Sequence, residues 1–123
     1  MIKVLGIGGI FFRAKDPDAL GRWYDETFGI TKVTESYDDP AWTQEGGTTV
    51  FAPFKQDTTY FGRPEQQWMI NFRVADLDAT VAALREAGIT VAVDTERHPN
   101  GRFAHLSDPE GNPIELWQEM PKP

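Results

Sequence analysis

The amino-acid sequence predicts an α+β fold built from two copies of a βαβββ module. The first observation is an internal repeat, because residues 12–18 resemble residues 72–78 at an offset of 60 positions. Residues 29–31 and 88–90 then share Gly-Ile-Thr at an offset of 59. The second observation is an Asp followed by helical spacing of apolar residues in each copy. The third is a hairpin pattern near the C-terminal end.

The first copy covers about residues 1–55 and is expected to begin with a strand over about residues 7–14. A helix follows Asp16, because the next apolar residues have i, i+3, i+4, i+8 spacing: Leu20, Trp23, Tyr24 and Phe28. Gly29 is expected to end this helix, since glycine tolerates the positive φ of a helix C-terminus. Three more strands are expected, over about residues 31–36, 42–44 and 48–54.

The second copy covers about residues 68–123 and repeats this order, with its first strand over about residues 68–74. A helix opens at Asp76, ends at Gly88 and carries an apolar stripe: Val81, Leu84 and Ala87. Strands are expected over about residues 90–94, 103–107 and 114–118. Residues 56–67 have linker composition, so we expect a single domain over 1–123 with two modules and a linker.

The hairpin contributes an acid to one face of the predicted sheet. Its turn has the residues that a type I turn prefers at its first, second and fourth positions: Asp108, Pro109 and Gly111. Side chains alternate between the faces of a strand, so Glu115 and Trp117 share one face while Ile114 and Leu116 share the other. A carboxylate beside a Trp on a sheet is either a ligand or a member of a pair.

Composition excludes several classes of function. A net charge of -7 and a pI near 4.7 leave no basic face for phosphates, so we expect neither nucleic acid nor an anionic membrane as partner. No apolar run approaches a transmembrane span or a signal peptide, which predicts a cytoplasmic protein. With no cysteine and only two histidines, any metal must bind nitrogen or oxygen ligands.

These residues resemble the vicinal oxygen chelate superfamily, which includes glyoxalase I, bleomycin-resistance proteins and extradiol dioxygenases. The resemblance is carried by Phe-x-x-x-x-Asp-Pro before the first helix, Trp-Tyr within it, Phe-Gly-Ile at its end, and the closing Asp-Pro-Glu-Gly-Asn-Pro-Ile-Glu-Leu. It covers about residues 5–118. It implies two modules whose mixed sheet curls into a cup around a cavity, often completed in a homodimer. The fold by itself does not determine the chemistry.

The resemblance also implies four metal ligands, of which this sequence retains one. Glu115 occupies the ligand position of the last strand. The positions on the opening strands of the two modules fall on Gly9 and Met69, and neither side chain suits the metals that imidazole and carboxylate bind. The fourth position lies on the strand 48–54, where no candidate can coordinate: Val50, Phe51 and Ala52. We therefore expect no confident metal site.

Strand alternation indicates what else the cup holds. The candidate ligand-binding residues share a face with the family's ligand positions: Phe11, Arg13, Asn71, Arg73, Phe103 and Trp117. On the hairpin, Ala104 and Leu106 suit the helix-packed side, which leaves His105 on the cavity side. An even register sets His105 directly opposite Glu115. Such a mixed polar and aromatic surface suits an organic ligand with polar groups.

Two alternatives stay open for the central pair. Glu115 either contacts a ligand or neutralises Arg13 or Arg73 in a buried ion pair. His105 is either an ordinary hydrogen-bonded strand residue or a candidate catalytic acid or base that works with Glu115.

The sequence therefore predicts a glyoxalase/bleomycin-resistance-like protein that binds a small organic molecule in its cavity, with no metal or other cofactor, and that forms a homodimer. The alternative is an enzyme. It would be either a lyase or dioxygenase with a divergent divalent-metal site, or a metal-free enzyme with acid/base catalysis by His105 and Glu115.

Overall fold

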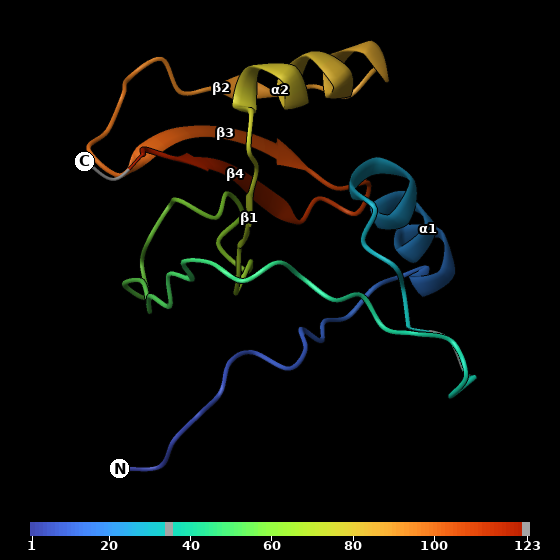
Figure 1. Cartoon of the computed structure of the whole chain (residues 1–123). Coiled ribbons are helices and arrows are strands. Elements are labelled where there is room, and N and C mark those ends of the chain that lie inside the picture. Colours follow the sequence, from blue (N-terminus) through green and yellow to red (C-terminus); the bar gives the residue numbers. More distant parts are fainter. Residues whose placement is uncertain (34–35, 122–123) are drawn as a thin grey trace.

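The structure, a computed structural model, describes residues 1–33 and 36–121 of the chain. Two helices and four strands follow one another in the order α, β, α, β, β, β (Figure 1). Their bounds are α1 Pro17–Phe28, β1 Ile70–Arg73, α2 Leu77–Glu86, β2 Ala92–Val93, β3 Gly101–Ser107 and β4 Pro113–Glu119. Every strand among these described residues therefore comes from the second copy of the repeat.

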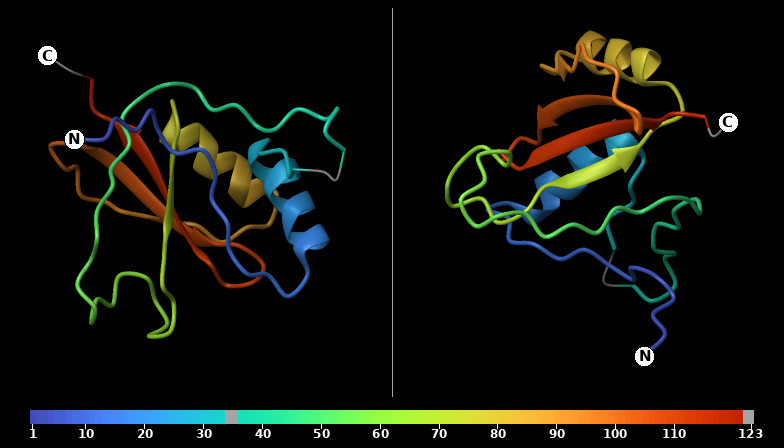
Figure 2. Two further views of the ribbon diagram at one scale, coloured as in Figure 1. Left: turned by 90° about the horizontal axis from the view of Figure 1, so that it is seen from below. Right: turned by 90° about the vertical axis from the view of Figure 1, so that its left-hand side faces the viewer.

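The four strands form one mixed sheet in the order β1-β4-β3-β2. β1 lies parallel to β4, whereas β3 is antiparallel to both β4 and β2. The crossover from β1 passes through α2, which covers one face of the sheet (Figures 1 and 2). A strand is present within each of the ranges expected over residues 68–74, 90–94, 103–107 and 114–118. The first is shortened to four residues and the second to two, whereas the last two are slightly longer than expected.

Both helices begin as the repeat predicts and α1 ends as predicted, whereas α2 ends at Glu86 with Ala87 as its C-cap, before Gly88 with its φ of 84°. Asp16 accepts a hydrogen bond from the Ala19 amide at 3.1 Å, and Asp76 accepts one from the Ala79 amide at 3.0 Å. Gly29 ends α1 with φ of 70°, a left-handed conformation that favours glycine. These signals are local in sequence, so each helix carries its own boundaries.

The hydrophobic core lies between the helices and one face of the sheet. α2 and the sheet supply most of it: Leu77, Val81, Leu84, Val91, Ala104, Leu106, Ile114 and Leu116. α1 adds Leu20 and Tyr24 from the first copy, with Trp23 and Phe28 packed against them. Ala104 and Leu106 lie on the helix-packed side, as the alternation predicts.

The hairpin turn is bound to α1 through a buried carboxylate. Asp108 accepts hydrogen bonds from the Glu110 and Asn112 amides at 2.9 and 3.0 Å, and the Gly111 amide donates to the Asp108 carbonyl. The Tyr24 hydroxyl donates to the same carboxylate at 2.7 Å. Burial, and then this contact with Asp108, raise the pKa of Tyr24 far above its ordinary value. The predicted turn thus joins the two copies.

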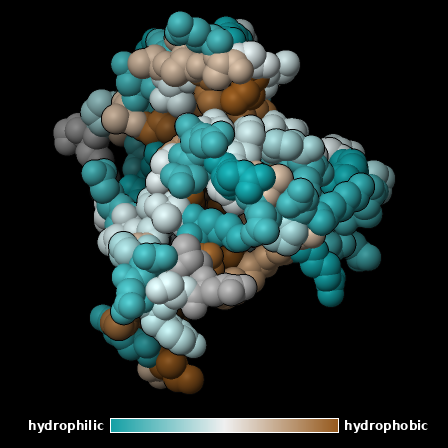
Figure 3. All heavy atoms as spheres, turned by 90° about the vertical axis from the view of Figure 1, so that its right-hand side faces the viewer, coloured by the Kyte–Doolittle hydropathy of each residue, from teal (hydrophilic) through white to brown (hydrophobic). Residues whose placement is uncertain are grey.

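The strands predicted for the first copy are absent from the described residues. Residues 7–14, 42–44 and 48–54 run as irregular chain, and so do the described parts of 31–36, where residues 34–35 lie outside the described residues. Figure 2 shows these segments passing along the side of the sheet opposite α2. Viewed from the α1 side, the surface is mostly hydrophilic, with hydrophobic side chains at its projecting lower end (Figure 3).

The difference has a physical cause. A strand is stable only when its backbone groups pair and one face is buried, and these segments lack a buried face: Phe11 is 93% exposed, and Ile10, Val50 and Phe51 are exposed as well. Glycines at positions 6, 8, 9, 46 and 47 further weaken strand formation. Alternation of apolar residues therefore overstated the strands of the first copy.

Candidate functional site

The candidate site lies on the sheet face opposite α2, where two adjacent rows of side chains cross three strands. In the first row Asn71 of β1 pairs with Glu115 of β4, which pairs with His105 of β3. The second row runs through the next positions on the same face: Arg73, Trp117 and Phe103. Sequence alternation therefore placed six predicted site residues on one surface.

Hydrogen bonds join the first row, which we call the polar row (Asn71, Glu115 and His105). The Asn71 amide donates to Oε1 of Glu115 at 2.7 Å. Nε2 of His105 lies 2.9 Å from Oε2 of the same carboxylate. The predicted register of His105 opposite Glu115 is confirmed, while the chemical roles of the two residues stay predictions.

Tyr60 completes this arrangement from outside the sheet. Its hydroxyl donates to Oε2 of Glu115 and lies 2.9 Å from Nε2 of His105. The residue belongs to the segment 56–67, which the sequence indicated only as a linker. Its neighbours Phe54 and Phe61 are also aromatic, and this cluster was the one available signal that the segment is more than a connection.

The carboxylate at the centre is buried but not neutral. Glu115 is only 8% exposed, and burial by itself would raise its pKa. Hydrogen bonds from His105, Tyr60 and Asn71 outweigh burial and lower the pKa below its ordinary value. Burial, followed by the contact with Glu115, raises the pKa of Tyr60 far above its ordinary value, so its hydroxyl stays protonated. The site therefore holds an anion surrounded by donors.

Aromatic side chains dominate the second row. The rings of Phe103 and Trp117 are stacked and parallel, with centroids 6.2 Å apart. Trp117 is held by a hydrogen bond from its indole nitrogen to the Asn100 carbonyl at 2.8 Å, and the His98 ring lies edge-on to Phe103. Trp117 is buried, at 6% exposed, and Phe103 is half-buried, so Phe103 supplies the accessible part of this aromatic pair beside the polar row.

Arg73 does not pair with Glu115. This bears on the alternative in which an arginine neutralises that glutamate. The Arg73 guanidinium donates to the Glu45 carbonyl at 2.7 Å, so it ties residues 45–47 of the first copy to the sheet. The partners of Glu115 among the described residues are Tyr60, Asn71 and His105 instead. The alternative in which an arginine neutralises this glutamate is therefore wrong for the described residues.

Two predicted site residues lie apart from the others. Phe11 and Arg13 line a separate cavity of about 580 Å³, whose other walls come from the end of the linker and the hairpin turn, and no member of the polar row lines it. Their placement beside Glu115 rested on a paired strand over residues 7–14. Because that strand does not form, strand alternation no longer relates them to the sheet.

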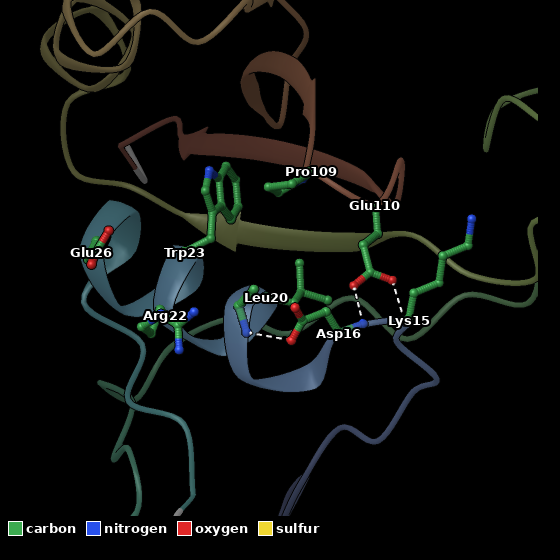
Figure 4. A pocket seen from close by; sticks show the side chains of 9 residues that line it. Lys15, Asp16, Leu20, Arg22, Trp23, Glu26, Pro109 and Glu110 are labelled. Atoms are coloured by element: carbon green, nitrogen blue, oxygen red, sulfur yellow. Dashed lines mark hydrogen bonds between the residues drawn. The ribbon is translucent and has the colours of Figure 1, made fainter.

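A second cavity, of about 430 Å³, lies between α1 and the hairpin turn (Figure 4). The Glu110 carboxylate accepts hydrogen bonds there from the Lys15 and Asp16 amides, at 2.6 and 3.1 Å. Trp23 and Leu20 supply its apolar wall. These contacts join the turn to the start of α1, so we assign them a structural role.

The residues at the family's metal position do not fit a metal ion. Both carboxylate oxygens of Glu115 already accept hydrogen bonds, and the nearest nitrogen ligand, Nε2 of His105, is directed at that carboxylate. Gly9 and Met69 offer no suitable donor. Within residues 1–33 and 36–121, no group of three or more His, Cys, Asp or Glu side chains is placed to hold a metal.

Residues 9–117 match the family described as the glyoxalase-like domain. TnmS3, an antibiotic-binding protein from Streptomyces sp. CB03234, is 26% identical to this chain, with 98% of this chain and 100% of that chain covered and a TM-score of 0.63. A glyoxalase/bleomycin resistance protein/dioxygenase superfamily member from Sphaerobacter thermophilus is 24% identical over 86% and 90% of the chains, with a TM-score of 0.55. Lactoylglutathione lyase from Agrobacterium tumefaciens is 22% identical over 85% and 87%, with a TM-score of 0.54.

The last two similarities concern the fold alone, and no curated protein sequence is significantly similar to this chain. The family match and these structures confirm the predicted α+β class and the resemblance to the vicinal oxygen chelate superfamily. No helix among the described residues has the length and apolar character needed to cross a membrane.

Proposed function

We propose, from the premise that this chain belongs to the glyoxalase-like domain family, that it binds a small organic molecule over the polar row and the adjacent Phe103–Trp117 stack. The single observation that carries this proposal is the buried, ionised Glu115, which is surrounded by hydrogen-bond donors on an aromatic face. A small number of convergent polar groups on a mostly apolar surface is typical of small-molecule sites. The antibiotic-binding relative TnmS3 supports the same class of function.

Binding without a metal is part of this proposal. The hydrogen bonds to Glu115 satisfy the carboxylate that the family uses as a ligand, and the other family positions carry no suitable donor. A metal held by Glu115 and His105 alone would keep most of its coordination sphere in water and would bind weakly.

A second candidate function is metal-free acid/base catalysis. It is favoured by the contact of 2.9 Å between Nε2 of His105 and Oε2 of Glu115, which is within reach for proton transfer. The Tyr60 hydroxyl lies at the same distance from this imidazole nitrogen. A His105→Ala variant that retains ligand affinity but loses turnover of that ligand would favour this candidate.

We also propose that the protein is a cytoplasmic homodimer. Large apolar side chains of the first copy are exposed in the single chain, among them Ile10, Phe11, Val50 and Phe51. A high exposure of several large apolar side chains favours an interface between proteins. Sedimentation equilibrium should give twice the chain mass of 13.9 kDa, and a monomer at micromolar concentration would contradict this part of the proposal.

The binding function is tested with chelator-treated protein and a library of aromatic and polar small molecules in a thermal-shift assay. We expect hits whose stabilisation is lost in Glu115→Gln and retained in Glu86→Gln, a control on the exposed side of α2. Calorimetric titration with Ni²⁺, Zn²⁺ and Mn²⁺ tests the absence of metal. Tight, stoichiometric metal binding would overturn metal independence, and hits indifferent to Glu115 would overturn the site.

A further inference from the structure

The Tyr60 side chain reaches the polar row from a segment that is not part of the sheet. Tyr60 is the second residue of a chain turn that is closed by a hydrogen bond from the Gly62 amide to the Thr59 carbonyl. The turn before it is closed by a hydrogen bond from the Thr58 amide to the Lys55 carbonyl. In both views of Figure 2 and in Figure 1 this segment is separate from the helices. Tyr60 is 47% exposed, so its side chain can leave the site without disrupting the core.

The hydroxyl of Tyr60 uses the hydrogen-bonding groups that the proposed site would present to a ligand. It donates to Glu115 and lies within hydrogen-bond distance of His105, the two residues at the centre of the proposed site. A side chain that uses both groups competes with any molecule that needs them. The binding site is therefore already filled by part of its own chain.

The ring of Tyr60 also has aromatic surroundings that suit it. It is stacked on Phe54, with centroids 5.8 Å apart and planes inclined by 29°, and it meets the His105 ring edge-on at 5.5 Å. The space between Phe54 and His105 thus accommodates a flat aromatic ring whose hydroxyl points at the Glu115 carboxylate. Beside the polar row, half-buried Phe103, which is stacked on buried Trp117, adds a further aromatic ring.

We propose that Tyr60 is an internal occupant of the binding site and that the ligand that replaces it is a phenol, an aromatic ring with a neutral hydroxyl. This inference rests on the proposed function and specifies its ligand class. The hydroxyl must be protonated, because an ionised carboxylate accepts a hydrogen bond from a donor and repels a phenolate. The elevated pKa of Tyr60 agrees with this requirement.

An internal occupant lowers the apparent affinity for an external ligand by the fraction of time that the site is free. Replacing Tyr60 by alanine removes the competitor, and it also leaves Glu115 and His105 without one hydrogen-bond partner. p-Cresol has the shape of the whole tyrosine side chain, of which alanine keeps only Cβ. It should therefore bind the truncated site better than the intact one.

The experiment is a calorimetric titration of p-cresol into wild type, Tyr60→Ala and Tyr37→Ala, where Tyr37 is an exposed tyrosine outside the site. We expect Tyr60→Ala to bind p-cresol about tenfold more tightly than wild type, with Tyr37→Ala unchanged. 4-Methylanisole, whose oxygen carries a methyl group in place of the proton, should lose most of this gain. Adding Glu115→Gln to Tyr60→Ala should abolish it.

A folded Tyr60→Ala protein that binds p-cresol no better than wild type would overturn the inference. If this variant does not fold, the same question is answered in wild type with ring-labelled tyrosine, because p-cresol at saturation should shift the Tyr60 ring resonances. Unchanged resonances would also overturn the inference. The proposed function survives either result if other molecules bind in a Glu115-dependent manner, whereas both fail if no molecule, p-cresol included, depends on Glu115.

Discussion

The two copies of the repeat have nearly the same local signals but different tertiary structures. Asp16 and Asp76 cap their helices with almost identical geometry, at 3.1 and 3.0 Å. Yet all four strands of the sheet come from the second copy. Helices satisfy their backbone groups within one segment, whereas strands depend on partners elsewhere in the chain. A repeated sequence therefore does not guarantee a repeated sheet.

The two copies also differ in how far their apolar side chains are buried. Leu116, in the central part of the sheet, is 0% exposed, because β1 and β3 flank its strand and α2 covers it. Phe11 in the first copy is 93% exposed. The first copy nevertheless contributes α1 to the common core through Leu20 and Tyr24. Its helix therefore covers part of the core of the second copy. Glu45, Gly46 and Phe54 are first-copy residues that contact residues of the candidate site.

The largest expected difference in stability is between truncation of Leu116 and truncation of Phe11. Leu116→Ala should lower the free energy of unfolding by about 3 kcal/mol, because it leaves a cavity in a fully buried position. Phe11→Ala should change it by less than about 0.5 kcal/mol in the monomer. Urea denaturation of both variants at low protein concentration measures the difference. Equal losses of unfolding free energy in the two variants would contradict the proposed difference in burial between the copies.

The contact between the copies should have the next largest effect. Tyr24→Phe removes the hydroxyl that donates to buried Asp108 at 2.7 Å and should cost about 2 kcal/mol of stability. Tyr37→Phe is the matched control, because Tyr37 is exposed, and it should cost nothing measurable. Denaturant midpoints compare the two. A Tyr24→Phe protein as stable as the control would mean that this hydrogen bond does not contribute to holding the copies together.

Glu115 gives the candidate site a pH dependence. Glu115→Gln should cost about 1.5 kcal/mol at pH 7, since it removes hydrogen bonds to an ionised acceptor. Folding lowers the pKa of this carboxyl, so its stabilisation is complete above the ordinary value of 4.5 and is lost as the pH falls through the lowered value. The difference between the two proteins should therefore shrink below pH 4.5 in denaturation experiments. A constant or growing difference would contradict the assigned pKa direction.

The smallest effects should come from the helix caps, where the copies are most alike. Asp16→Ala and Asp76→Ala each remove a side-chain acceptor at a helix N-terminus and should each cost about 1 kcal/mol. Asp57→Ala, an exposed acid of the linker, serves as control. Thermal unfolding by circular dichroism is sufficient to measure them. Unequal costs would show that the tertiary setting affects the helices as well as the strands.

Much of the site could be predicted because strand alternation depends only on sequence. Once the hairpin turn was placed, the faces of Glu115, His105 and Trp117 followed, and the register confirmed them. Phe11 and Arg13 could not be placed in this way, since alternation has meaning only in a strand that is paired. Tyr60 was missed because a linker has no periodicity from which the direction of a side chain can be inferred.

The sequence by itself determined the elements whose causes are local: both capped helices, the hairpin turn, and the side-chain alternation that gathers the polar row on one face. Which copy forms the sheet, and which residue completes the site, depends on the folded chain. The reason is that strand pairing and the contact of Tyr60 with Glu115 join groups far apart in the chain. Such contacts depend on which segments fold against one another, and composition and periodicity do not specify that.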